Sequence, residues 1–183
     1  MGPTNQPNAK WLASVSLRRD YCWDNDETEV PGRAFPGWIR ASASDEREVP
    51  FMSTNSRLEL TTIIDRAQLA TICPRWNHLE FTRRTAPVVP QSVRRDFSPN
   101  IVCINIEGPG LPDSSFYDLP GIIGQSEDPQ KQFLVPFVKS LVTEYIEHPN
   151  ALILLTCSLS SDIATSTASG IARSLKAEDR CIG

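Results

Sequence analysis

The sequence predicts an α/β fold whose central sheet is doubly wound and mostly parallel. Three observations indicate this fold. An acid, Asp118, directly follows a short apolar segment, Ser114–Tyr117, that is expected to be a strand. A helical pattern of apolar residues begins near Phe137 and stops before Pro149, and the apolar run Ala151–Leu155 comes next. Such a continuous run is typical of a strand covered on both faces, as in a parallel sheet.

The most informative segment is Asp118-Leu119-Pro120-Gly121. An acid at the carboxyl end of a parallel strand is how nucleotide-binding α/β folds place a carboxylate near a magnesium ion bound to phosphate. The alternative interpretation is an ordinary turn, because proline presets φ and glycine tolerates positive φ. The four residues by themselves leave both interpretations open.

The first part of the chain is expected to be less regular. Residues 1–10 are polar and are predicted to be disordered. Trp11–Tyr21 alternates polar and apolar residues, imperfectly, and predicts a strand. Residues from about 22 to 55 are charged and interrupted by proline and glycine, which is typical of an irregular insertion or a hairpin.

A capping-box pattern at Ser56–Glu59 predicts the beginning of a helix, which Cys73-Pro74 ends. Its apolar residues share one face, so we expect this face to pack on the core. Residues 75–95 resemble a loop. Apolar residues between Ile101 and Ile106 then predict a strand, and Gly108-Pro109-Gly110 predicts a turn after it.

Three further elements are predicted after Asp118. The first is the helix around Phe137–Tyr145, with Pro136 in its first turn, where a missing N–H is harmless. Asp162 is suited to cap a second helix, and Arg180–Gly183 begins another strand. The second helix has one apolar face, formed by Ala164, Ala168, Ile171, Ala172 and Leu175.

Composition indicates one globular domain. The chain has 183 residues, of which 40% are hydrophobic and 22% charged, and its net charge of −4 argues against a general nucleic-acid binder. We find no long apolar span and no signal segment, and therefore expect a cytoplasmic protein. An odd number of widely spaced cysteines predicts reduced, mostly buried thiols rather than disulfides. The cysteines are Cys22, Cys73, Cys103, Cys157 and Cys181.

The likeness to a known family is strongest between Phe97 and the end of the chain, and a weaker part begins near Trp11. The segments that carry it are Phe97-Ser98-Pro99-Asn100, Gly108–Pro112, Phe116–Ile122, Val138–Ile146 and His148–Leu155. They resemble the large GTPases of the dynamin superfamily, most closely its fungal dynamin-like branch. The resemblance implies a P-loop GTPase-like fold, GTP and Mg²⁺ as ligands, GTP hydrolysis, and a role in membrane remodelling or fission.

Two motifs of that family are missing from these 183 residues. No phosphate loop of the type G-x-x-x-x-G-K-[ST] occurs, and Gly108-Pro109-Gly110 has neither the lysine nor all of the amides that phosphates need. The guanine-reading Thr-Lys-x-Asp is not present either. We therefore expect residues 11–183 to be a truncated GTPase domain that lacks the P-loop strand. Its sheet would be open at the centre, with exposed apolar side chains and marginal stability.

The resemblance also implies roles for two residues. Asp118 would hold Mg²⁺ through a water, and the Gly121 amide would contact the γ-phosphate, while Ile122–Asp128 would order only in the triphosphate state. It implies pairing between two GTPase domains, and membrane contact only through regions outside this sequence. Without the phosphate loop, the isolated chain is predicted to bind no GTP and to be inactive. The alternative is a non-catalytic interaction module that pairs with an intact GTPase domain.

Other patterns are weaker. Asp24–Glu29 resembles the beginning of a calcium loop but lacks the glycine and the last acid that such a loop needs. Cys73 and His78 have no second ligand pair for zinc. The pairs Arg83-Arg84 and Arg94-Arg95 are expected to be solvated.

Overall fold

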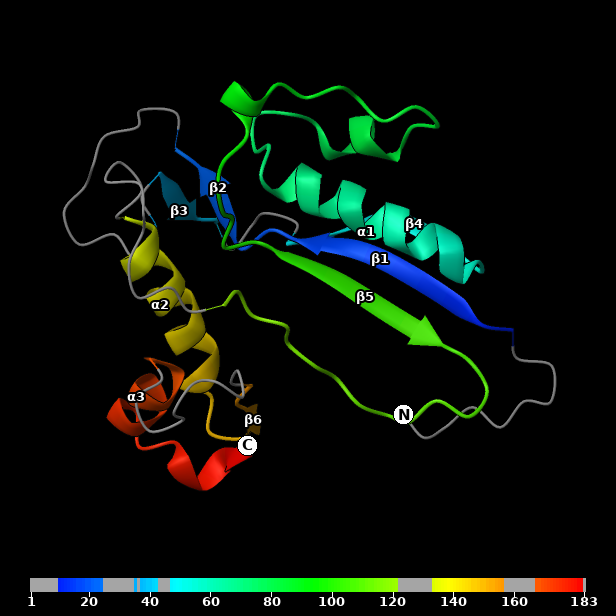
Figure 1. The fold of residues 1–183 in the computed structure, drawn as a ribbon. Helices are drawn as coiled ribbons and strands as arrows, with labels where there is room; N and C mark the ends of the chain where they lie inside the picture. Colours follow the sequence, from blue (N-terminus) through cyan, green and yellow to red (C-terminus); the bar gives the residue numbers. More distant parts are fainter. Residues whose placement is uncertain are drawn as a thin grey trace. The chain divides into compact units, whose positions relative to one another are not determined.

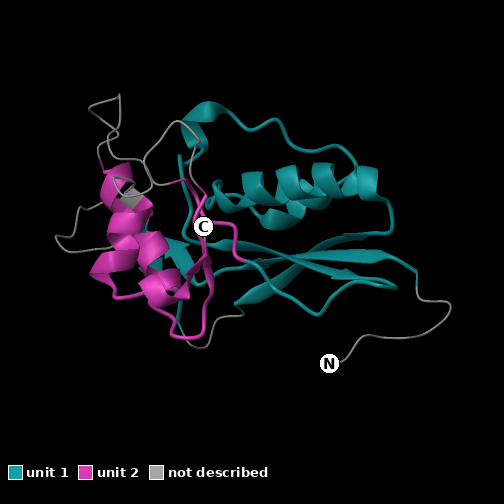
Figure 2. Ribbon diagram, turned by 60° about the horizontal axis from the view of Figure 1, so that its bottom comes forward, with its two compact units in different colours: residues 1–28, 37–116 teal, residues 29–36, 117–183 magenta. Residues whose placement is uncertain are grey.

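The computed structural model describes residues 10–24, 35, 37–42, 47–121, 133–156 and 167–182. The chain divides into two compact units, residues 1–28 with 37–116 (unit 1) and residues 29–36 with 117–183 (unit 2), which are coloured in Figure 2. The predictions for residues 1–9, Ile122–Asp128 and Asp162 lie outside the described residues, as does nearly all of Asp24–Glu29.

Unit 1 contains a three-stranded antiparallel sheet with the order β4-β1-β5. The central strand β1 (Leu12–Arg18) pairs with β4 (Glu48–Thr54) and β5 (Ile101–Glu107), and Figure 1 shows β1 and β5 side by side. A bulge interrupts the β1–β4 pairing between Val15 and Ser16. Buried residues alternate with more exposed residues along β1, which is typical of an antiparallel sheet with one covered face.

This sheet corrects part of the predicted fold class. The mixture of helices and strands agrees with an α/β protein, and the strands predicted at Trp11–Tyr21 and near Ile101 are confirmed. However, three of the four strand pairings in the described residues are antiparallel, so the expectation of a mostly parallel sheet is wrong there. That expectation depended on the apolar run Ala151–Leu155 and on a strand at Ser114–Tyr117. The run contains β6, which does pair in parallel, but Ser114–Tyr117 pairs with no strand of the described residues and is not a strand.

Helix α1 (Arg57–Thr71) confirms the helix predicted from the capping box. Ser56 Oγ accepts a hydrogen bond from the Glu59 N–H at 3.4 Å. The return half of the box passes through a third residue: the Ser56 N–H donates to Thr54 Oγ1 at 3.0 Å, and the Thr54 hydroxyl donates to the Glu59 carboxylate at 2.7 Å. The end of β4 is thereby tied to the first turn of α1.

The core of unit 1 lies where α1 packs on the sheet. The two short 3₁₀ helices η1 (His78–Thr82) and η2 (Gln91–Val93) are the regular elements of the predicted loop, and Phe81 of η1 is completely buried. The buried residues of this core are Val15, Leu17, Val49, Phe51, Ile63, Ala67, Ala70, Cys73, Phe81 and Val89.

A hairpin of β2 (Tyr21–Trp23) and β3 (Trp38–Arg40) belongs to the same unit. A hairpin was one of the two interpretations of residues 22–55, and this hairpin confirms it. The other interpretation, an irregular insertion, is wrong for residues 48–54, because they form β4 of the main sheet. Asn100 fixes the hairpin: its Oδ1 accepts the Tyr21 N–H at 2.9 Å, and its Nδ2 donates to the Tyr21 carbonyl at 3.0 Å.

Unit 2 contains α2 (Leu134–Ile146), α3 (Thr167–Ser174), the 3₁₀ helix η5 (Glu178–Arg180) and a parallel pair of short strands, β6 (Ile153–Leu154) and β7 (Cys181–Ile182). The helices and the parallel pair confirm the predictions for this region, with Pro136 in the first turn of α2.

Strand β6 is covered on one face and bare on the other. Ile153 is 8% exposed, whereas Leu152 and Leu154 on the opposite face are 77% and 73% exposed. The prediction that this apolar run is covered on both faces is therefore wrong for the described residues. A continuous apolar run shows that burial is favourable, but it does not supply the element that covers the second face.

Candidate functional site

Asp118 follows an extended segment that is attached to α2 by an aromatic contact. The rings of Tyr117 and Tyr145 lie 4.8 Å apart at an interplanar angle of 43°. Asp118 itself is exposed and forms no hydrogen bond or ion pair with the described part of the chain. The Asp118 carboxylate is thus exposed to solvent, and it directly follows Tyr117, which the ring contact with Tyr145 holds in place.

Gly121, the other predicted site residue, is also exposed. Residues 118–121 form no hydrogen-bonded turn, and the glycines with positive φ among the described residues are Gly37 and Gly110, not Gly121. A Cβ built on Gly121 would meet nothing within 4 Å. The lack of a hydrogen-bonded turn and of a positive φ at Gly121 counts against the ordinary-turn interpretation. The open space lies where a side chain would begin, and it allows close approach to the backbone on that side.

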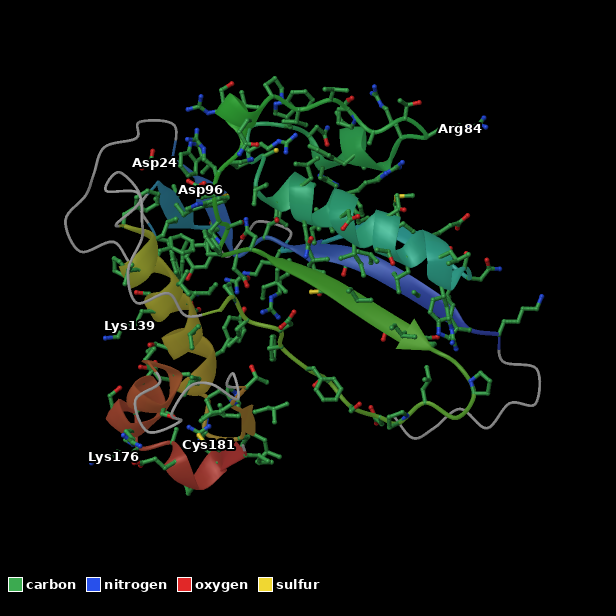
Figure 3. All side chains as sticks on the ribbon, viewed as in Figure 1. Asp24, Arg84, Asp96, Lys139, Lys176 and Cys181 are labelled. Carbon is green, nitrogen blue, oxygen red and sulfur yellow. The ribbon has the colours of Figure 1, made fainter. Side chains whose placement is uncertain are left out.

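The donor set at Asp118 is compatible with magnesium. Mg²⁺ prefers oxygen ligands and is usually held by one or two carboxylates, several waters and substrate phosphates. Asp118 offers one carboxylate that no described residue engages. The lysines in the described part of unit 2, Lys139 and Lys176, are exposed side chains on the surface of the unit (Figure 3).

The weaker candidates have structural roles. The Cys73 thiol is completely buried, and burial raises its pKa, although Arg94 opposes this. Arg83 forms an ion pair with Glu80 at 2.8 Å. Arg83 and Arg84 are exposed, as predicted. Arg94 is half-buried and donates to the Val89 carbonyl at 2.6 and 3.2 Å, so the prediction that it is simply solvated is wrong. The described residues contain no cluster of three or more His, Cys, Asp or Glu arranged to hold a metal ion.

The described cysteines Cys22, Cys73, Cys103 and Cys181 are free thiols, as the sequence predicts. The prediction that they are mostly buried is wrong, because only Cys73 is buried and Cys22 is exposed. In addition, no helix within the described ranges has both the length and the apolar character needed to cross a membrane.

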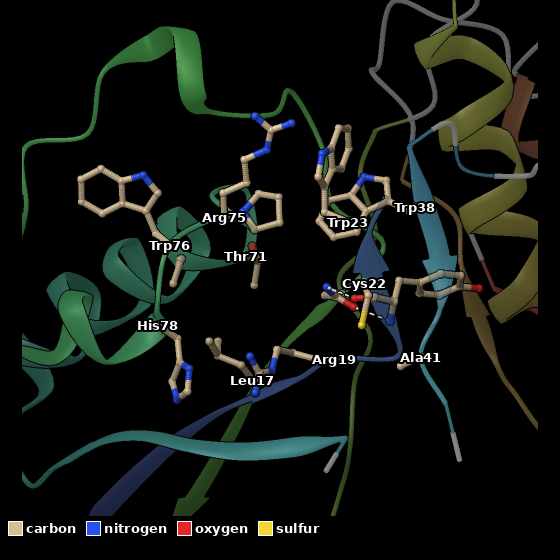
Figure 4. A pocket seen from close by; sticks show the side chains of 14 residues that line it. Leu17, Arg19, Cys22, Trp23, Trp38, Ala41, Thr71, Arg75, Trp76 and His78 are labelled. Carbon is tan, nitrogen blue, oxygen red and sulfur yellow. Dashed lines mark hydrogen bonds between the residues drawn. The ribbon is translucent and has the colours of Figure 1, made fainter. Parts of the chain in front are cut away.

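The sequence reasoning did not single out three tryptophans that line a cavity of about 820 Å³ in unit 1, namely Trp23, Trp38 and Trp76 (Figure 4). They come from β2, β3 and the segment after α1. The spacing of these residues follows no helical or strand period, so no local pattern identifies them; the signal in the sequence is the number of tryptophans, four in 183 residues.

Comparison with known proteins gives a consistent result. Residues 50–183 match the sequence profile described as the Dynamin family. The human interferon-induced GTP-binding protein Mx2 is 32% identical over 90 residues, which are 49% of this chain and 13% of that protein. Phragmoplastin DRP1A of Arabidopsis thaliana is 33% identical over 81 residues, which are 44% of this chain and 13% of that protein. The matched region therefore spans 13% of the length of these relatives. No solved structure matches the chain.

Proposed function

Because this chain belongs to the dynamin family, we propose that it carries part of a GTPase domain in which Asp118 is a magnesium ligand and the Gly121 amide is a phosphate contact. The observation that carries the proposal is the exposed Asp118, which has no partner among the described residues and lies within a region that matches the family. When bound, Mg²⁺ would neutralise charge on the phosphates of GTP. The chain's own contribution is to present a carboxylate and an amide three residues apart on one extended segment.

We further propose that these 183 residues bind no GTP by themselves. The sequence contains no G-x-x-x-x-G-K-[ST] and no Thr-Lys-x-Asp. In P-loop proteins several backbone amides, a lysine and a hydroxyl hold the phosphates and the metal together. One carboxylate and one amide do not replace that set, because most of the phosphate charge would remain without a partner.

Titration of the purified chain with a fluorescent GTP analogue, with and without Mg²⁺, tests this second proposal. We expect no saturable binding in either condition. Saturable, magnesium-dependent binding in the micromolar range would contradict it.

The role of Asp118 is tested in a different molecule. Sequencing of the transcript on both sides of this coding region establishes whether a phosphate loop and a Thr-Lys-x-Asp are encoded in frame. In a protein that carries them, Asp118→Asn is expected to lower the rate of GTP hydrolysis roughly a hundredfold. The matched control Asp113→Asn, which changes an exposed acid a few positions earlier in the sequence, is expected to leave the rate unchanged. Equal rates for wild type and Asp118→Asn would refute the assignment.

A second candidate function is an interaction module that pairs with an intact GTPase domain. The bare face of β6, with Leu152 and Leu154 more than two thirds exposed, favours it. Covering such a leucine gains about 1.5–3 kcal/mol. Light scattering of the chain alone and mixed with a GTPase domain of a relative tests this function, and strictly monomeric behaviour in both samples would exclude it.

We propose the cellular role and the location of the protein from its resemblance to the family. Membrane remodelling or fission, a cytoplasmic location and the fungal dynamin-like branch all belong to the complete protein and are proposed for it on the resemblance. Localisation of a fluorescently tagged copy expressed from its own locus is the direct test. Even distribution through the cytoplasm, with no enrichment at any membrane under any growth condition, would contradict the membrane role.

A further inference from the structure

The cavity in unit 1 is lined by neither Asp118 nor Gly121, the residues assigned above. Its walls come from the end of β1, the β2–β3 hairpin, the last turn of α1 and the segment that follows α1 (Figure 4). Its volume of about 820 Å³ falls within the range of small-molecule sites, which is about 300–1,000 Å³.

The positive charge of the cavity wall comes from arginine. Arg19 and Arg75 line the cavity, and none of its lining residues is an acid. His78 also lines it but adds no charge at pH 7, because its pKa lies below the ordinary value. The side chain of Arg19 extends toward the His78 ring (Figure 4), and burial together with the Arg19 charge lowers the pKa of His78. The Arg19 guanidinium lies in a cavity that no carboxylate lines, so it attracts an anion, since guanidinium groups bind carboxylate and phosphate oxygens with charge-assisted hydrogen bonds.

Part of the remaining wall is aromatic, since three tryptophans and Tyr21 line the cavity. Trp23 and Trp38 pack edge to face, with their ring centroids 5.3 Å apart. Trp76 lines the cavity from the segment after α1. The Nε1 of Trp23 is buried and has no hydrogen-bond partner in the described part of the chain, so this ring also carries an unused donor. Flat aromatic walls favour a ligand with a ring of its own.

The cavity is also pre-formed. The two hydrogen bonds between Asn100 and the Tyr21 backbone hold β2 in place, and Arg95 lies over the Trp23 ring at 4.0 Å. The Arg95 N–H donates to the Ile72 carbonyl at 2.8 Å, which connects this wall to the end of α1. A site whose walls are fixed before binding loses less conformational entropy when the ligand arrives.

We propose that this cavity is a binding site for a small aromatic anion, such as an aryl phosphate, with the ring among Trp23, Trp38 and Trp76 and the anionic group at Arg19. The ligand places its ring against the tryptophans and its negative oxygens within reach of the guanidinium group. This site does not depend on GTP or on the assignment of Asp118. A negative result for the proposed function would therefore leave this proposal unaffected.

Naphthyl phosphate is the probe, and it is measured on the purified chain by isothermal titration calorimetry. Naphthol supplies the ring without the charge, and inorganic phosphate supplies the charge without the ring. We expect naphthyl phosphate to bind at least about tenfold more tightly than either, because only it meets both walls. Arg19→Gln should weaken it about tenfold, whereas the control Arg84→Gln, which changes an exposed arginine outside the cavity (Figure 3), should not.

A second readout requires no variant of the binding residues. Cys22 lines the cavity and is exposed, so its reaction with a thiol reagent should slow when naphthyl phosphate is bound. Labelled peptides identified by mass spectrometry separate Cys22 from the other cysteines. Equal affinity for naphthol or for inorganic phosphate, an equal loss in Arg84→Gln, or an unchanged rate at Cys22 would each overturn the proposal.

Discussion

Gly37 provides the sharpest test of the β2–β3 hairpin. Its φ is +75°, and a Cβ at this position would lie 2.4, 2.7 and 3.0 Å from three atoms of the Trp23 ring. Real Cβ contacts are almost never shorter than 3.0 Å. Gly37→Ala therefore introduces two costs, a left-handed backbone conformation for alanine and a steric overlap with Trp23.

The two costs can be estimated separately. The left-handed conformation costs about 1–2 kcal/mol for a residue with a Cβ. To relieve the overlap, the Trp23 ring must leave its position under Arg95 and beside Trp38. The cation–π contact contributes about 0.5–2 kcal/mol and the edge-to-face pair about 0.5–1.5 kcal/mol. We expect Gly37→Ala to lower the free energy of unfolding by about 2–5 kcal/mol.

Gly110 supplies the matched control, because its φ is +76° but a Cβ there would meet nothing within 4 Å. Gly110→Ala should cost only the backbone share, about 1–2 kcal/mol. Urea unfolding followed by tryptophan fluorescence measures both variants, since all four tryptophans lie in unit 1. If the two variants are destabilised equally, the reasoning about Trp23 is refuted.

Three other predictions concern stability and thiol chemistry. Thr54→Val removes the hydroxyl that links Ser56 to Glu59 and should lower the free energy of unfolding by about 1 kcal/mol, measured by urea unfolding; no change would show that the link is dispensable. Arg180 donates hydrogen bonds to the carbonyls of Ile146, His148 and Ala151, and Arg180→Lys loses part of this set. Hydrogen exchange in α2 should become about tenfold faster or more, and unchanged exchange would contradict this prediction. Burial raises the pKa of both Cys73 and Cys103, so at pH 8 both should remain thiols and react more slowly with iodoacetamide than the exposed Cys22, and comparable rates would count against this.

The elements of the fold could be predicted where the signal is local. Ser56 and Glu59 identified the beginning of α1, Pro149 marked the end of the α2 region, and the apolar run after it located β6. Each signal depends on residues within a few positions of one another, so it can be recognised in a single sequence. Ser114–Tyr117 had the same kind of signal but forms no strand, because a strand also needs a neighbour, which the segment itself does not encode.

The candidate sites show the same difference between local signals and contacts of distant residues. The sequence identified Asp118 because an acid beside Leu-Pro-Gly is a compact motif, and the structure places that acid in an exposed position without a partner among the described residues. The cavity of unit 1 was not identified, because Arg19, Trp38 and Trp76 are far apart in the sequence. Each tryptophan alone is expected to be a core residue, and only the packing of the β2–β3 hairpin near the end of α1 makes them one surface.

The bare face of β6 connects the two functions proposed for the chain. A missing neighbouring strand and an unbound partner both leave Leu152 and Leu154 exposed, so exposure alone does not distinguish them. The two explanations differ in what removes the exposure. A strand within the same protein covers the leucines at any protein concentration, whereas a partner covers them only above its dissociation constant. Hydrogen exchange at Ile153 and Leu154 measured across a dilution series therefore separates them: protection that falls on dilution indicates a partner, and exchange that is independent of concentration excludes one over that range.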